Sequence, residues 1–242
     1  MTENSEESND ASLKNSRPKV LFFDVNETLL DLAPLKKAVT QALGGKEDLV
    51  ALWFTTLLQY SLVTTAGKKY EHFGNIGAAT LSMVAANHKI SISQQEARQI
   101  VKPTIRNLQP HPEVKNALSQ LKADGYALVA FTNSSNEGLR EQMEHAGLTS
   151  YFDELLSVED VGKFKPFKEA YDWAAQAMDV KPEESMMIAA HGWDVAGALW
   201  AGWRAAFVSR PGHQQFPLAP ITEIEASDLQ KIADKLVTYV KA

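Results

Sequence analysis

Polar side chains follow four short apolar runs of the chain, at the points where these runs end. A carboxylate in such a place, Asp24, is a candidate nucleophile or general base, although a strand-end acid also caps helices. An ammonium nearby, Lys165, would hold that carboxylate ionised by lowering its pKa, although a Lys-Pro pair is also common in solvated loops. The polar positions are Asp24, Thr132, Asn133, Lys165, His191 and Asp194.

The runs that carry these residues have the character of buried strands. Near-continuous apolar runs indicate strands that are buried on both faces, and helical patterns at 137–146, 168–178 and 195–201 separate the later ones. This alternation predicts right-handed crossovers and a parallel sheet, in which ligands bind at the carboxyl ends of the strands. The runs are Lys19–Val25, Tyr126–Thr132, Glu154–Glu159, Met186–Ala190 and Arg204–Arg210.

The segment between the first two runs shows only helical periodicity, from about Ala33 to Gln109. It ends at "QPHPEV", where Pro110 and Pro112 make a hinge plausible because proline disfavours helix in the preceding residue. We therefore predict three parts: a disordered tail at 1–18, a doubly wound α/β core at 19–32 and 111–242, and a helical cap domain at 33–110.

Composition excludes several classes of function. The chain has 242 residues, a formal charge of −6 and no cysteine, so disulfides, thiolate metal sites and cysteine nucleophiles are ruled out. Lysines are scattered among acids, so we expect no nucleic-acid or membrane partner. The polar first 19 residues lack the apolar region of a secretory signal, and we expect no run of roughly 18 apolar residues that spans a bilayer. These features predict a cytoplasmic protein.

Four motifs occur in an order that resembles the haloacid dehalogenase superfamily: "FFDVNETL", "AFTNSS", "KFKPFKEAY" and "IAAHGWDVAGA". Within it the chain is most similar to the L-2-haloacid (type II) dehalogenases, through "LW" before the cap helix, "KP" followed by Tyr171, and "WD" with "GA" in the last motif. The resemblance implies a Rossmann-like core with a helical cap inserted after the first strand, and a homodimer. It also implies hydrolysis of short L-2-haloacids to 2-hydroxy acids, without metal or cofactor.

The resemblance also assigns roles to individual residues. Asp24 would attack the carbon that bears the halogen, form an aspartyl ester and be oriented by Lys165. Thr132 and the backbone N–H groups after Asp24 would bind the substrate carboxylate, and Asn133 and Phe73 would line the halide cradle. The remaining predicted site residues are Val25 and Asn26 in the loop after the nucleophile, Thr28, Tyr171 and Asp194 in a polar network, and Trp193 and Phe54 in the pocket wall.

Two alternatives stay open. Most of the superfamily transfers phosphoryl groups with Mg²⁺, which needs hard oxygen ligands. Phosphatases of this superfamily have a general acid where this chain has Asn26, and a second carboxylate in the last motif where it has His191. A non-catalytic relative that binds a small anion is the other alternative, supported by Phe54, which stands where the family usually has a halide-binding arginine. Trp53, Asn133 and Phe73, or Lys68 or Lys69 if not simply solvated, would have to replace that arginine.

A second departure from the family suggests how water is activated. His191 stands where the family commonly has Asn, and Glu27 where it generally has Gly. An imidazole near neutral pKa is a competent general base, and a carboxylate partner fixes its tautomer. We therefore hypothesise that Glu27 pairs with His191. The alternative for His191 is a loop histidine that is solvated or caps a helix. The other histidines, His213 included, are predicted to be surface or capping residues.

Overall fold

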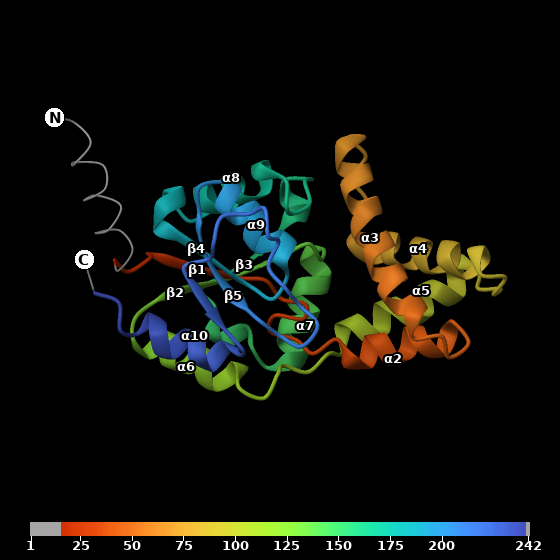
Figure 1. Ribbon diagram of the computed structural model, residues 1–242, viewed down its shortest axis with the longest axis horizontal. Helices are drawn as coiled ribbons and strands as arrows, with labels where there is room; N and C mark the ends of the chain where they lie inside the picture. The colour runs from red at the N-terminus through yellow and green to blue at the C-terminus, as the bar shows by residue number, and fades with distance from the viewer. Residues whose placement is uncertain (1–15, 241–242) are drawn as a thin grey trace.

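The protein is described by a computed structural model that covers residues 16–240, and Figure 1 shows two parts side by side. One part is a six-stranded sheet with helices on both faces, and the other is a group of helices that follows the first strand. The elements are β1 (Val20–Phe23), α2 (Ala33–Ala42), α3 (Asp48–Ala66), α4 (Phe73–Asn87), α5 (Gln94–Arg106), α6 (Val114–Ala123), β2 (Ala127–Thr132), α7 (Asn136–Ala146), β3 (Glu154–Ser157), α8 (Lys168–Ala177), β4 (Ser185–Ala189), α9 (Gly192–Trp200), β5 (Arg204–Val208), β6 (Ile224–Ala226) and α10 (Leu229–Leu236), with short 3₁₀ turns at Thr149–Tyr151, Val158–Asp160 and Pro182–Glu184.

The sheet is parallel throughout and has the strand order β3-β2-β1-β4-β5-β6. Every residue of β1 and β4 is buried, as expected for central strands covered on both faces. In Figure 1, α6 and α10 lie together on one face of the sheet, and α8 and α9 lie on the other. The chain reverses its direction across the sheet between β1 and β4, which is the place where open α/β sheets bind ligands. The predicted doubly wound fold is confirmed.

Helices α2 to α5, which we call the helical insertion, join the sheet through two adjacent chain crossings. The Asp31 N–H donates to the Gln109 carbonyl at 2.9 Å, and the His111 N–H donates to the Leu29 carbonyl at 2.9 Å. The outgoing and returning segments therefore pair beside the end of β1. This pairing holds the insertion next to the strand ends and agrees with the hinge predicted at "QPHPEV".

Local capping explains where the helices next to the site begin. The Ser93 hydroxyl accepts a hydrogen bond from the Glu96 N–H, and the Glu96 carboxylate accepts one from the Ser93 N–H. This reciprocal pair is a capping box at the start of α5. Ser135 caps α7 in the simpler way. The two helices meet where Arg106 of α5 pairs with Glu137 and Glu141 of α7, so one contact between insertion and core is ionic.

Two sequence expectations need correction. Arg17 was assigned to the tail, but its guanidinium pairs with Asp124 at 2.7 Å and lies over the Tyr126 ring, so the ordered core begins before residue 19. The rest of the predicted tail, residues 1–15, lies outside the described residues. By length and composition alone, α3 is apolar enough to cross a membrane, although no such run was expected. About a third of its apolar window, 33%, is buried within the structure, and α3 packs against α4.

Candidate active site

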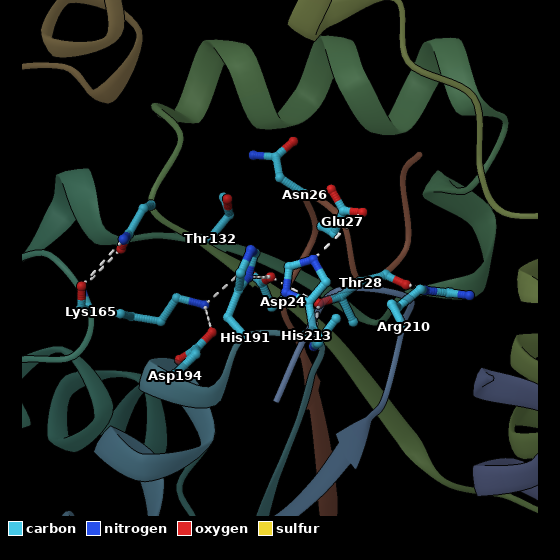
Figure 2. Close-up of polar contacts among 12 residues, drawn as sticks. Asp24, Asn26, Glu27, Thr28, Thr132, Lys165, His191, Asp194, Arg210 and His213 are labelled. Carbon is cyan, nitrogen blue, oxygen red and sulfur yellow. Dashed lines mark hydrogen bonds and ion pairs between the residues drawn. The ribbon is translucent and has the colours of Figure 1, made fainter. Parts of the chain in front are cut away.

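The candidate nucleophile Asp24 lies directly after β1 and is 5% exposed. Its N–H still belongs to the sheet, since it donates to the carbonyl of Ile188 on β4 at 3.1 Å. One carboxylate oxygen, Oδ1, accepts from Lys165 Nζ at 3.1 Å. The other, Oδ2, accepts from the Thr28 hydroxyl at 2.9 Å and lies 3.0 Å from His191 Nδ1. The residues predicted around the nucleophile thus meet at the ends of β1 and β4 (Figure 2).

Lys165 is buried and its ammonium lies between two carboxylates. Besides Asp24, Nζ donates to Asp194 Oδ2 at 2.6 Å and to the Phe131 carbonyl at 2.9 Å, which uses all three hydrogens of an ammonium. The Tyr171 hydroxyl donates to the other oxygen of Asp194 at 2.7 Å. Asp194 and Tyr171 thus contact one another and Lys165, as the predicted polar network requires. Tyr171 lies behind Asp194, however, and not among the residues that line the cavity described below.

The electrostatic result is an ionised nucleophile. Burial alone would raise the pKa of the Asp24 carboxyl, but the charge of Lys165 and the bonds from His191 and Thr28 lower this pKa well below its usual range. For Asp194 burial dominates and raises the pKa, with Lys165 and Tyr171 acting against it. Asp24 is therefore a carboxylate at any physiological pH.

Thr28 joins the loops that follow β1 and β4. Its hydroxyl donates to Asp24 and accepts the Ala190 N–H at 2.9 Å. The Thr28 carbonyl accepts from the Arg210 guanidinium at 2.8 Å, and Arg210 also pairs with Glu113 at 2.8 Å. Thr28 therefore has the contacts that its predicted role in holding the loop requires. Arg210, which carried no clear signal in the sequence, is a buried brace for the same loop.

His191 contacts the nucleophile directly. Because an ionised carboxylate only accepts hydrogen bonds, Nδ1 carries the hydrogen in the bond to Asp24, and Nε2 of the neutral ring is then an acceptor. Nε2 is buried without a partner among the described residues. The ring stacks on Phe54 and Trp193, with centroids 5.9 and 5.2 Å away. A solvated loop histidine is therefore the wrong alternative for this residue.

The hypothesised direct pair between Glu27 and His191 is wrong. The Glu27 carboxylate instead pairs with Lys36 Nζ at 2.9 Å and lies 3.7 Å from His213 Nε2. Burial opposes ionisation of Glu27, but the bonds and charges of His213 and Lys36 lower its pKa to about 2. Sequence reasoning missed His213 because the loop after β5 reaches the site only through the fold.

A small cavity of about 30 Å³ covers Asp24, between the strand ends and the insertion. Most of its wall is apolar, which favours exclusion of water from a displacement step. Six predicted substrate-binding residues line it, whereas the Val25 side chain is fully buried in the core. The predicted residues in the wall are Asn26, Phe54, Phe73, Thr132, Asn133 and Trp193.

The predicted replacements for the family's halide-binding arginine are only partly present. The Trp53 ring N–H donates to the Gly77 carbonyl at 2.9 Å and is not free for a ligand. Lys68 and Lys69 are exposed and do not line the cavity. The ring N–H of Trp193 is buried and, within residues 16–240, has no hydrogen-bond partner. Trp193 also lines the cavity, so this unpaired donor belongs to a residue of the wall.

The donors around Asp24 do not fit the magnesium ion that the phosphatase alternative requires. Both oxygens of Asp24 and both oxygens of Asp194 already accept from Lys165, Thr28, His191 or Tyr171, and the Lys165 ammonium lies between the two carboxylates. Among the described residues there is no cluster of three His, Cys, Asp or Glu arranged for a metal. We derive no step through a metal ion.

Comparison with known proteins agrees with this geometry. The chain is 27% identical to an (S)-2-haloacid dehalogenase of Pseudomonas putida, over 90% of this chain and 97% of the relative. It is 27% identical to a haloacetate dehalogenase of a Moraxella strain, over 80% and 87%. The structure of an L-2-haloacid dehalogenase from Xanthobacter autotrophicus with chloropropionic acid covalently bound superposes with a TM-score of 0.82, at 20% identity, over 89% and 97% of the two chains. The family model for haloacid dehalogenase-like hydrolases matches residues 18–202, and this chain belongs to that family.

Proposed function

We propose that the protein hydrolyses short L-2-haloacids to 2-hydroxy acids and halide. In the first half-reaction the Asp24 carboxylate attacks the carbon that bears the halogen, a C–O bond forms as the C–halogen bond breaks, and halide leaves. In the second, water attacks the carbonyl carbon of the ester, the bond between that carbon and the ester oxygen breaks, and the hydroxy acid leaves. The sum consumes one water and releases one halide and one proton.

The observation that carries this proposal is the state of Asn26 beside an ionised Asp24. The Asn26 amide donates to the Ser134 hydroxyl at 3.2 Å and accepts from Gln142 at 2.8 Å, so it is fixed and has no proton to give. A phosphate ester needs a general acid for its alkoxide leaving group, whereas a halide leaves without a proton. The site therefore provides what carbon–halogen displacement needs and lacks what ester phosphatases need.

The apolar wall of the cavity suits an uncharged carbon–halogen group next to Asp24. Removal of water leaves the Asp24 carboxylate poorly solvated, which strengthens its interactions and favours attack once a haloacid is bound. The cavity is small, about 30 Å³, so we propose short haloacids as substrates. The L-configuration is proposed from the named (S)-2-haloacid relatives. Thr132 and the backbone after Asp24 are proposed to bind the substrate carboxylate, and Asn133, Phe73 and Trp193 the departing halide.

The first experiment is halide release from L- and D-2-bromopropionate and from bromoacetate, with EDTA present. We expect L-selective release that EDTA does not reduce. Asp24→Asn, which keeps the shape of the side chain and removes the nucleophile, should abolish release. Cleavage of a phosphate ester that requires Mg²⁺, with no halide from any haloacid, would contradict the proposal.

A second experiment tests His191 as the base for ester hydrolysis. Its Nδ1 lies 3.0 Å from Oδ2 of Asp24, the carboxylate that becomes the ester. His191→Asn should therefore keep the rate of the displacement step and slow the hydrolysis of the ester. Intact-protein mass spectrometry after mixing with L-2-bromopropionate should then show a stable mass increase on the protein. Unmodified protein with normal turnover would exclude this role.

Assembly and location are also proposals. We propose a cytoplasmic homodimer, as the family resemblance implies. Exposed apolar side chains of α3, among them Leu52 and Val63, support an interface on the insertion. Sedimentation equilibrium at micromolar concentration tests the dimer, and a monomer at all concentrations would exclude it.

A further inference from the structure

His213 belongs to the loop that follows β5. Its side chain lies between those of Glu27 and His191 (Figure 2). Its Nε2 is 3.7 Å from Glu27 Oε1. Its ring meets the His191 ring edge to face, with centroids 5.4 Å apart and planes at 80°. Glu27 therefore reaches the candidate base through a second imidazole.

The proposed reaction, on which this inference rests, creates a need for such a residue. Each turnover releases one proton at the ester, and Asp24 must return to its ionised form before the next substrate binds. His191, which takes that proton, is 5% exposed and lies against Phe54 and Trp193. The proton thus starts from a ring that is almost completely buried.

A second, larger cavity offers this proton a path to solvent. It has a volume of about 670 Å³, lies between α2, α3 and the loop of His213, and shares His191 and Phe54 with the small cavity over Asp24. The side chain of His213 is 21% exposed and lines this larger cavity. His213 therefore contacts the buried base on one side and an open space on the other.

The backbone and the ion pair of Glu27 hold its carboxylate in place beside His213. Glu27 has φ of +66°, a left-handed conformation that glycine adopts more readily than other residues. The carboxylate is held by Lys36, whose own side chain is half exposed at the cavity mouth. A fixed carboxylate stabilises an imidazolium beside it, so Glu27 places a negative charge where His213 would carry the proton.

We propose that His213, held by Glu27, is a positioning residue that acts through His191 in ester hydrolysis. The O–H bond of the attacking water breaks as an N–H bond forms on His191. The two rings touch edge to face without a hydrogen bond between them, so we propose that the proton passes to His213 by way of a water molecule. The His213 imidazolium is stabilised by Glu27, and the proton then leaves to water or buffer in the larger cavity. The charged groups that face His213 are Glu27 and Lys36, with Lys37 and Glu47 further out in the same cavity wall.

The test is a rapid-quench experiment on His213→Asn with L-2-bromopropionate. Displacement needs no proton transfer, so the first bromide equivalent should appear at the wild-type rate. Steady-state turnover should fall about tenfold or more, within the range of general acid–base effects, and the ester should accumulate by intact-protein mass. Added imidazole should restore turnover in a concentration-dependent way, since the larger cavity admits it. Glu27→Gln should show the same pattern more weakly.

The matched control is His88→Asn, the same exchange at an exposed histidine after α4. It should match the wild type in both phases. A His213→Asn enzyme with turnover within twofold of wild type and no ester would overturn the proposal. So would an equal fall in burst and turnover that imidazole does not restore, because that pattern indicates a structural role. Absence of bromide from the wild type would instead refute the dehalogenase function itself.

Discussion

Lys165 shows how strongly one residue determines the state of this site. Its buried ammonium is shared by Asp24 and Asp194, so neither carboxylate is left without compensation in a region that excludes water. Removal of one member of a buried ion pair leaves an uncompensated charge, which costs far more than an exposed pair contributes. The same residue that orients the nucleophile is therefore a main support of the fold at the strand ends.

We predict that Lys165→Met lowers the free energy of unfolding by about 3–5 kcal/mol. It should also abolish halide release. The charge of Lys165 is the largest of the effects that lower the pKa of Asp24, so its removal should raise this pKa and leave less of the nucleophile ionised. Urea unfolding followed by circular dichroism measures the first effect. Adding Asp194→Asn to the variant should recover part of the lost stability, because one of the two uncompensated charges is then absent. If the free energy of unfolding of Lys165→Met alone lies within about 1 kcal/mol of the wild-type value, the folded variant holds its two carboxyl groups in the protonated form.

Elements of the sheet were largely predictable, and the links between distant loops were not. The runs that became β1 to β5 are nearly continuous and apolar, and helical patterns separate the later ones, so the local sequence suffices to place them. β6 was missed because it has three residues, of which only Ile224 is buried. The contact of His213 with Glu27 depends on how the loop after β5 returns over β1, and residue spacing carries no signal of that return.

Helix α3 determines the size of the substrate cavity through Phe54. This ring forms part of the wall of both the small cavity and the larger one, and it stacks on His191. It therefore separates the reacting centre from the open space. An apolar ring in this position, where the family resemblance leads us to expect an arginine, suits a partition better than a halide ligand.

We predict that Phe54→Ala joins the two cavities and changes chain-length preference. The ratio of kcat/KM for 2-bromohexanoate to that for L-2-bromopropionate should rise about tenfold or more, in the range expected for apolar pocket contacts. Turnover of the short substrate should fall, because water enters the displacement site. The matched control is Gln59→Ala, on the same helix but exposed and outside both cavities. An unchanged ratio would show that the partition lies elsewhere.

At the scale of the whole molecule, the site ties global stability to pH. Asp24 and Glu27 both have a folded-state pKa below the ordinary value, so the folded protein holds these protons less tightly than the unfolded chain. Such groups contribute stability that is complete above the unfolded pKa and is lost as pH falls through the folded pKa. The loops after β1, β4 and β5 should therefore come apart on acidification.

We predict that Glu27→Gln flattens the acid limb of the stability curve. The pKa of Glu27 falls from 4.5 to about 2 on folding, so wild-type stability from this group should decline as pH falls from about 4.5 toward 2. The variant cannot take up this proton, so it should be less stable than wild type at pH 7, and the difference should shrink through that window. Urea unfolding at a series of pH values measures both curves, with exposed Glu47→Gln as the matched control. A constant difference between the curves would show that Glu27 stabilises the fold by packing and not by its charge.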